Sequence, residues 1–193
     1  MTDYSDDIRA AVAVLRKGGI ILYPTDTVWG IGCDATNSEA VRKVFEIKRR
    51  EDAKALITLV GSEAQLERTV SGIPDVAYQL IEFSDKPLTI VYDGIAPYSG
   101  IAPELLAPDG SIGVRLTGED FSRRLCLAFG KPIVSTSANI SGEPAAATFA
   151  EISQEILDAA DYVCTSRRTD CTPAKPSTVM RLSEDGSFKV IRP

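Results

Sequence analysis

Histidine is absent from this chain of 193 residues. The chain therefore has no imidazole to act as a general base or a metal ligand, which argues against a zinc centre or a Ser-His-Asp mechanism. Its four cysteines lack a CxxC pair and a secretory context, so we expect reduced thiols that pack in the interior: Cys33, Cys126, Cys164 and Cys171. Any chemistry must depend on charge placement, hydroxyls, carboxylates or a magnesium ion brought by a substrate.

Long hydrophobic runs and an excess of basic residues are also missing. The longest apolar stretches, such as Ile20–Tyr23, have the length of a strand and are too short to cross a bilayer. The acidic N-terminus lacks the basic and then apolar layout of a signal peptide, so we expect a cytoplasmic protein without a membrane segment. With a net charge of −6, binding of a polyanion requires a locally basic cleft.

Helical and strand patterns alternate along the chain, which indicates a mixed α/β sheet. Helices are expected around Ile8–Leu15, from an N-cap at Ser38, from Ser62 and Pro74, over Glu119–Phe129 and from Thr148 to about Ala159. Strands are expected at Ile20–Tyr23, Val28–Cys33, Ala55–Val60, Leu88–Tyr92, Ser111–Arg115, Pro132–Ser135 and Tyr162–Cys164, with a closing antiparallel hairpin of Thr178–Leu182 and Phe188–Ile191. No linker interrupts this pattern, so residues 1–193 are predicted to form one domain.

The segment Tyr23-Pro-Thr-Asp-Thr-Val-Trp-Gly places two hydroxyls and a carboxylate at the end of a strand, followed by glycine. Polar groups at strand ends bind ligands in open α/β sheets. A capped turn that satisfies only its own backbone is the alternative interpretation.

Four cations stand at the end of the helix that begins near Ser38, in an otherwise acidic chain: Lys48, Arg49, Arg50 and Lys54. Complementarity to the helix dipole, at ~0.3–1 kcal/mol per charge, explains one or two of them more readily than four. If the helix ends at Lys48, an extended backbone brings Lys48 and Arg50 to one side, where they could clamp a triphosphate.

A polar turn, Ser135–Gly142, follows an apolar strand and offers hydroxyls, an amide and backbone N–H groups to ribose or phosphate oxygens. No GxSxG elbow is present, which argues against a nucleophilic serine. Arg115 ends another buried strand and requires an anionic partner. That partner is either a substrate carboxylate or a structural aspartate.

In this order and spacing the segments resemble the threonylcarbamoyl-AMP synthase family, the YrdC-type domain, from about Ile8 to Pro193. The resemblance is carried by Tyr23-Pro-Thr-Asp-Thr-Val-Trp-Gly, by the KxR pair Lys48 and Arg50, and by the SxN pair Ser137 and Asn139, with Ser177 and Arg192 downstream. The family's fold is a twisted mixed α/β sheet with flanking helices around a deep, positively lined cleft. Because Arg192-Pro193 closes the chain, we expect the short single-domain form.

The resemblance implies that L-threonine, bicarbonate and ATP are joined into threonylcarbamoyl-adenylate and pyrophosphate. Partner proteins then transfer the threonylcarbamoyl group to tRNA, and a weak direct tRNA contact is allowed. It also implies that Lys48 and Arg50 are catalytic and that no protein metal ligand is assigned, Mg²⁺ arriving with ATP. Threonine is expected to be held by Thr27, Arg115, Ser135 and Ser177, and ATP by Lys48, Arg50, Lys54, Ser111, Ser137, Asn139 and Arg192.

The chain departs from the family pattern at two places. Phe83–Lys86 stands where many relatives have Trp-Pro-Gly, and Ala145 stands where a small hydroxyl residue is common, which removes one expected ATP contact. The alternative function is a module of the same fold that binds nucleotide or RNA without making the adenylate. Retention of the complete KxR and SxN set favours the enzyme. A carbamoyl-transfer subunit of the hydrogenase-maturation type would need zinc-binding and acylphosphatase-like segments, which this sequence does not contain.

Overall fold

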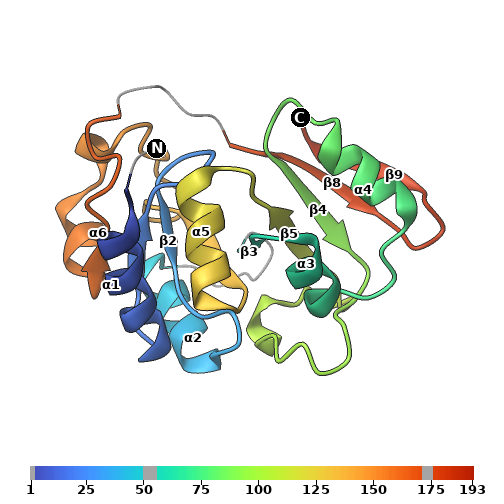
Figure 1. Ribbon diagram of the computed structural model, residues 1–193, viewed down its shortest axis with the longest axis horizontal. Coiled ribbons are helices and arrows are strands. Elements are labelled where there is room, and N and C mark those ends of the chain that lie inside the picture. The colour runs from blue at the N-terminus through green and yellow to red at the C-terminus, as the bar shows by residue number, and fades with distance from the viewer. Residues whose placement is uncertain (1–2, 50–55, 171–175) are drawn as a thin grey trace.

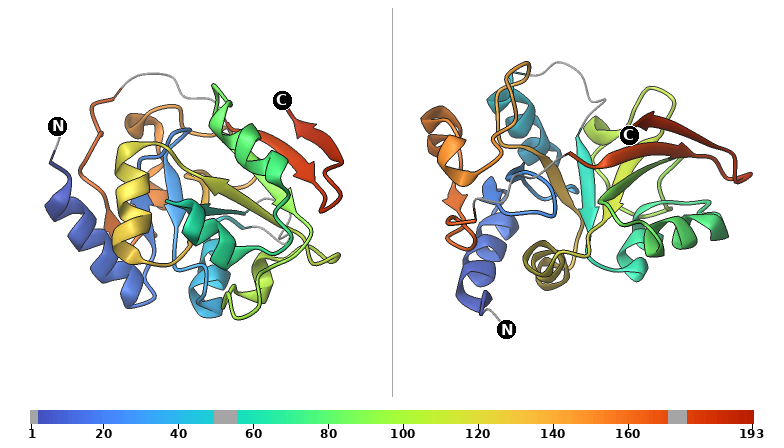
Figure 2. Two further views of the ribbon diagram at one scale, coloured as in Figure 1. Left: turned by 45° about the vertical axis from the view of Figure 1, so that its right-hand side comes forward. Right: turned by 90° about the horizontal axis from the view of Figure 1, so that it is seen from above.

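A computed structural model describes residues 3–49, 56–170 and 176–193, whose strands form one nine-stranded sheet (Figures 1 and 2). The strand order is β7-β1-β2-β6-β3-β5-β4-β8-β9. The strands are β1 (Ile21–Tyr23), β2 (Gly30–Gly32), β3 (Ile57–Val60), β4 (Leu88–Tyr92), β5 (Ile112–Leu116), β6 (Ile133–Ser137), β7 (Tyr162–Val163), β8 (Thr178–Leu182) and β9 (Phe188–Arg192). In the view of Figure 1, α5 and α3 stand in front of the sheet.

The helices connect these strands and flank the sheet: α1 (Ser5–Arg16), α2 (Ser38–Ile47), α3 (Glu63–Thr69), α4 (Asp75–Glu82), α5 (Asp120–Phe129) and α6 (Gln154–Asp158), with short 3₁₀ turns η2 (Pro103–Leu105) and η3 (Phe149–Glu151). Pairing is parallel for β1–β7, β3–β5 and β4–β8, and antiparallel between the other neighbours. The predicted mixed α/β sheet and the closing antiparallel hairpin, β8–β9, are therefore confirmed.

The register of the central strands divides their side chains between a core face and a face toward the site. One row across the sheet runs through Val134, Thr58, Val114 and Ile90, all buried. Because side chains alternate along a strand, the neighbouring positions point the other way. Among those, Ser135, Ile57, Arg115, Gly113 and Val91 line the two cavities described below. The sheet thus provides both the core and the floor of the site.

Two helix boundaries differ from the sequence-based expectation. Asn37, not Ser38, is the N-cap of α2, because its side-chain oxygen accepts the Ala40 N–H at 3.1 Å. The single helix expected from Thr148 to Ala159 is divided into η3 and α6. The hydroxyl of Ser153 accepts the Ile156 N–H at 3.4 Å and begins α6 as a separate helix. Ser62 is the N-cap of α3, as predicted.

Three cysteines lie in the described part of the chain, and all three are free and buried: Cys33, Cys126 and Cys164. This confirms the expectation of packed thiols for these positions, whereas Cys171 lies outside the described residues. Burial raises the pKa of each of the three thiols, so they remain protonated and unreactive at neutral pH.

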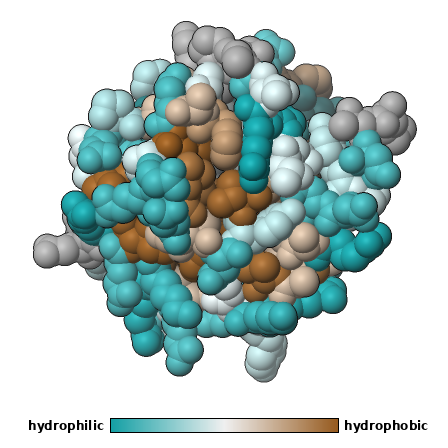
Figure 3. Space-filling view, turned by 90° about the vertical axis from the view of Figure 1, so that its left-hand side faces the viewer, coloured by the Kyte–Doolittle hydropathy of each residue, from teal (hydrophilic) through white to brown (hydrophobic). Residues whose placement is uncertain are grey.

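On the side of the molecule that carries α1 and α6, hydrophobic side chains show at the surface between hydrophilic ones (Figure 3). Partly buried apolar residues of these elements, among them Val14 and Leu157, pack against the main core.

Within the described residues, no helix is long and apolar enough to span a membrane.

Candidate active site

Lys48 connects the end of α2 to the polar turn that follows β6. It is the C-cap of α2, and the next residue, Arg49, adopts the left-handed conformation (φ 50°) that turns the chain out of the helix. The Lys48 side chain is only 1% exposed. Its Nζ donates to the carbonyl oxygens of Ser137 at 2.6 Å and Asn139 at 2.7 Å. The Lys48 carbonyl in turn accepts the Ser141 N–H at 3.0 Å.

These contacts place Lys48 of the KxR pair against the turn that carries the SxN pair. A buried ammonium that donates charge-assisted bonds to two carbonyls holds the turn in a single conformation. Lys48 therefore positions the turn, and its predicted contact with the ATP phosphates stays a prediction. Arg50 and Lys54, the other predicted phosphate-binding cations, lie outside the described residues.

Asn139 stabilises the same turn through its amide. Its Nδ2 donates to the carbonyls of Ile140 at 2.9 Å and Glu143 at 2.7 Å. Its Oδ1 is buried and accepts no hydrogen bond from the described residues. A buried oxygen without a donor is costly, so a ligand group that donates to Oδ1 would bind favourably there.

A cavity of about 260 Å³ lies beside this turn and is lined by every residue predicted to bind threonine. It is walled by Thr27, Arg115, Ser135 and Ser177, and also by Ser137 and Arg192 from the predicted ATP set. The structure thus brings together side chains from β5, β6, β9 and two loops. The described lining includes two arginines and no acidic side chain, so the cavity is basic although the chain is acidic overall.

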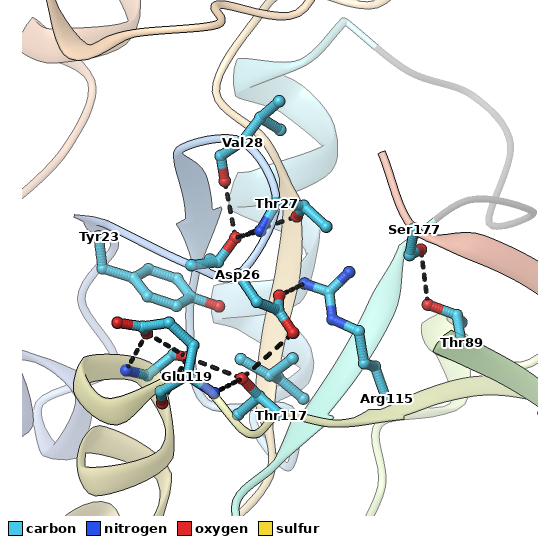
Figure 4. Close-up of polar contacts among 12 residues, drawn as sticks. Tyr23, Asp26, Thr27, Val28, Thr89, Arg115, Thr117, Glu119 and Ser177 are labelled. Carbon is cyan, nitrogen blue, oxygen red and sulfur yellow. Dashed lines mark hydrogen bonds and ion pairs between the residues drawn. The ribbon is translucent and has the colours of Figure 1, made fainter. Parts of the chain in front are cut away.

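Arg115 is the most buried cation of this cavity, with 3% of its surface exposed. Its guanidinium pairs with Asp26 Oδ1 at 3.1 Å, while its Nε is buried without a partner among the described residues. In the close-up, Arg115 lies between Asp26 and the hydrogen-bonded pair Thr89 and Ser177 (Figure 4). The structural aspartate considered in the sequence analysis is therefore present. It leaves part of the guanidinium for a second anion.

Burial raises the pKa of Asp26, and the nearby Arg115 opposes that rise. The other carboxylate oxygen of Asp26 accepts from the Thr117 hydroxyl at 3.4 Å. This carboxylate fixes the orientation of Arg115 from the side away from Ser177 (Figure 4).

A second cavity, of about 510 Å³, adjoins the first one and shares Ile57 and Arg192 with it. Its walls are mostly apolar and contain Ser111 from the predicted ATP set. The apolar lining residues are Leu56, Ile57, Val91, Leu105, Ala107, Val179 and Ile191. A mostly apolar cavity beside a basic one suits a purine nucleotide whose base is buried and whose phosphates extend toward cations. Ala145, where a hydroxyl was expected, lines the first cavity and offers no polar side chain there.

A β-bulge brings two consecutive residues of β9 into this second cavity. Val179 pairs with Arg192 and Met180 pairs with Val190, so Ile191 has no partner on β8. Side chains normally alternate between the two faces of a strand, but a bulge reorients them. Ile191 and Arg192 consequently both line the cavity, where Arg192 also donates to the Ser177 carbonyl at 2.9 and 3.1 Å.

Two charged residues of the second cavity, Asp109 and Arg181, were not among the residues predicted from the sequence. Asp109 accepts hydrogen bonds from Ser111, and Arg181 joins Asp109 to Asp93. The signals available were the Asp-Gly-Ser turn before β5 and strand alternation, which puts Arg181 on the same face as Val179.

The family of this chain is shown by its similarity to known proteins. The Sua5_yciO_yrdC family, described as Telomere recombination, matches residues 13–193, and the chain belongs to this family.

The chain is 38% identical over 154 residues to the threonylcarbamoyl-AMP synthase of Chromohalobacter salexigens, covering 79% of this chain and 81% of that protein. It is also 38% identical over 172 residues to the putative threonylcarbamoyl-AMP synthase of Methanocaldococcus jannaschii, covering 89% of this chain and 78% of that protein.

Among solved structures, that of P. abyssi Sua5 complexed with L-threonine superposes with a TM-score of 0.79 at 27% identity. The match covers 91% of this chain and 50% of the Sua5 chain. This chain therefore spans about half the length of that protein.

Proposed function

We propose that this chain is an L-threonylcarbamoyl-adenylate synthase, which joins L-threonine, bicarbonate and ATP and releases pyrophosphate. The observation that carries the proposal is the basic cavity in which Arg115 faces the hydroxyls of Thr27, Ser135 and Ser177. The Arg115 Nε is buried and has no hydrogen-bond partner among the described residues. An α-carboxylate satisfies such a guanidinium, and hydroxyls suit the remaining polar groups of an amino acid. The threonine complex of P. abyssi Sua5 and the names of the curated relatives support this assignment.

The two adjoining cavities suit the two halves of the reaction. With threonine on Arg115 and the base in the apolar cavity, the α-phosphate lies near Arg192, the residue common to both. The threonine amine and bicarbonate form a carbamate and water, and a carbamate oxygen then attacks the α-phosphorus as pyrophosphate leaves. Both partners are anions, so cations placed in advance lower the barrier more than proton transfer does.

We propose that magnesium enters with the triphosphate as part of the substrate. Within the described residues, no group of three or more acidic or cysteine side chains could hold a metal ion. Asp26, a nearby carboxylate, already forms an ion pair with Arg115. The phosphate oxygens are therefore the main ligands, as is common for Mg²⁺ at nucleotide sites.

The product, a mixed anhydride, requires an acceptor enzyme, and we propose that partner proteins pass its threonylcarbamoyl group to tRNA. The net charge of −6 gives no general attraction for tRNA, so a direct contact would be confined to basic segments.

The proposal is tested by incubating the purified protein with labelled bicarbonate, ATP, Mg²⁺ and L-threonine. We expect labelled adenylate and pyrophosphate that form only when threonine is present. Nucleotide binding without any threonine-dependent product would overturn the proposal and leave a binding module of the same fold.

A further inference from the structure

We propose that the Ser111 hydroxyl acts as an obligatory hydrogen-bond acceptor that selects an adenine nucleotide over a 6-oxopurine nucleotide. This inference rests on the proposed function and specifies how its nucleotide is chosen. Ser111 lies just before β5, is 4% exposed and lines the apolar cavity.

The hydrogen of this hydroxyl is already engaged. Ser111 Oγ lies 2.6 Å from Asp109 Oδ1, and the Ser111 N–H donates to the same oxygen at 3.1 Å. An ionised carboxylate accepts only, so the serine must be the donor in this short bond. A hydroxyl has one hydrogen, and its remaining capacity toward the cavity is therefore as an acceptor.

Asp109 is kept in its ionised form by the same contacts. The Ser111 hydroxyl, and then Arg181, hold the pKa of Asp109 well below its usual value. Arg181 Nη1 lies 2.7 Å from Asp109 Oδ2, and its Nη2 lies 2.7 Å from Asp93 Oδ1, so the guanidinium is fixed between two carboxylates. Since the carboxylate cannot rotate away freely, it holds the Ser111 hydroxyl in one orientation.

The Asp-Gly-Ser sequence by itself does not explain this arrangement. It occurs twice, as residues 109–111 and 185–187, and both glycines have φ 82°. In the second copy the Ser187 N–H also donates to Asp185 Oδ1, at 2.8 Å, but Ser187 is exposed in the β8–β9 turn. The two copies share the turn, and the first adds a buried position in the cavity and the contact with Arg181.

The proposal places the base in this cavity with its carbon-6 edge at Ser111, where an acceptor discriminates between purines by their substituent at carbon 6. The amino group of adenine donates a hydrogen bond, whereas the oxo group of hypoxanthine or guanine is an acceptor and would face the lone pairs of Ser111. A buried pair of acceptors loses the bond and adds repulsion. Discrimination of about 10- to 100-fold is expected from one such contact.

The experiment compares ATP with ITP, because inosine carries the 6-oxo group and lacks the 2-amino group of guanosine. The ratio of kcat/KM values is measured from threonine-dependent pyrophosphate release. We expect the wild-type protein to favour ATP by about 10- to 100-fold. Ser111→Ala and Asp109→Ala should reduce that preference to a few-fold, the second because it frees the hydroxyl to donate. Asp185→Ala, in the matching exposed turn, should leave the preference unchanged.

Each alternative result has a distinct meaning. No threonine-dependent turnover with any nucleotide would overturn the proposed function itself. Equal use of ATP and ITP by the wild-type protein would overturn this inference and leave the function standing, and so would an undiminished preference in Ser111→Ala. If a variant fails to fold, as judged by its melting transition, Ser111→Cys provides the same comparison with a much weaker acceptor.

Discussion

The Nζ of Lys48 lies 2.7 Å from the carbonyl oxygen of Asn139. This buried ammonium joins Lys48 of the KxR pair to the turn that carries the SxN pair. We expect Lys48→Met to leave the carbonyls of Ser137 and Asn139 without this donor. The free energy of unfolding should fall by about 2–4 kcal/mol, and the melting temperature by roughly 5–10 °C. Urea and thermal unfolding measure both quantities.

Nucleotide affinity should weaken in the same variant, since the turn that carries Ser137 and Asn139 loses its fixed shape. Lys43→Met, on the exposed side of the same helix, is the matched control. Unchanged stability in Lys48→Met would show that the ammonium does not hold the turn.

Arg115→Lys should weaken threonine binding selectively. Lysine keeps the charge but lacks the planar fork that can contact Asp26 and a substrate carboxylate at once. We expect the KM for threonine to rise about 10- to 100-fold while the KM for ATP changes little. Steady-state kinetics with each substrate varied in turn measure the split. Arg9→Lys, whose ion pair with Asp6 is on the surface, provides the control. A rise in the KM for ATP alone would show that Arg115 binds the nucleotide and not threonine.

Two glycines of β2 should respond differently to alanine. A methyl group on Gly30 would lie 3.2 Å from Thr25 Cγ2 and 3.4 Å from Ser135 Oγ, at the wall of the basic cavity. We expect Gly30→Ala to raise the threonine KM severalfold with a small effect on stability. A methyl group on Gly32 would overlap the carbonyl oxygen of Val134. Gly32→Ala should therefore cost about 1–3 kcal/mol of stability. The threonine KM and the melting temperature are measured for both variants. If both variants changed these two quantities in the same way, the different surroundings assigned to Gly30 and Gly32 would be contradicted.

Asp7 should make stability depend on pH in the acid range. Burial alone would raise its pKa, but hydrogen bonds from Ser166, Tyr162 and the Thr165 N–H outweigh the burial and lower it. The stabilisation is therefore fully present above the unfolded value of 3.8 and is lost as the pH falls through the lower folded value.

We expect Asp7→Asn to be less stable than the wild type at pH 7, with the difference shrinking below about pH 4. Urea titrations between pH 7 and pH 3 test this expectation, and Asp6→Asn, an exposed neighbour, is the control. A constant difference across that range would show that the charge of Asp7 is not responsible.

Periodicity and motif spacing were sufficient to predict the mixed sheet and the closing hairpin. The family resemblance named six of the residues that line the basic cavity: Thr27, Arg115, Ser135, Ser137, Ser177 and Arg192. The start of α2 was misplaced by one residue, because Asn37 and Ser38 are both good caps and only the backbone geometry distinguishes them. The break at Ser153 was missed for a related reason, since a serine inside a helical pattern is compatible with either continuation or a new cap.

The roles of individual side chains were harder to predict than their location. The charge of Lys48 suggested a phosphate ligand, which stays a prediction, and the fold shows a further role, because the buried ammonium donates to backbone carbonyls. Arg181 and Asp109 are far apart in the sequence, so their contact depends on the pairing of β8 with β4 and could not be read from local spacing. Such long-range contacts decide what a residue binds.

The order of strands in the sheet also has a consequence for synthesis on the ribosome. β4 acquires its neighbour β8 about ninety residues later, and the bulge at Ile191 that brings Arg192 to both cavities forms only after β9 has paired. A nascent chain can build the half of the sheet around β3, β5 and β6 well before that point. Occupancy by a nucleotide should therefore be among the last properties that the growing chain gains, and it would report completion of the fold.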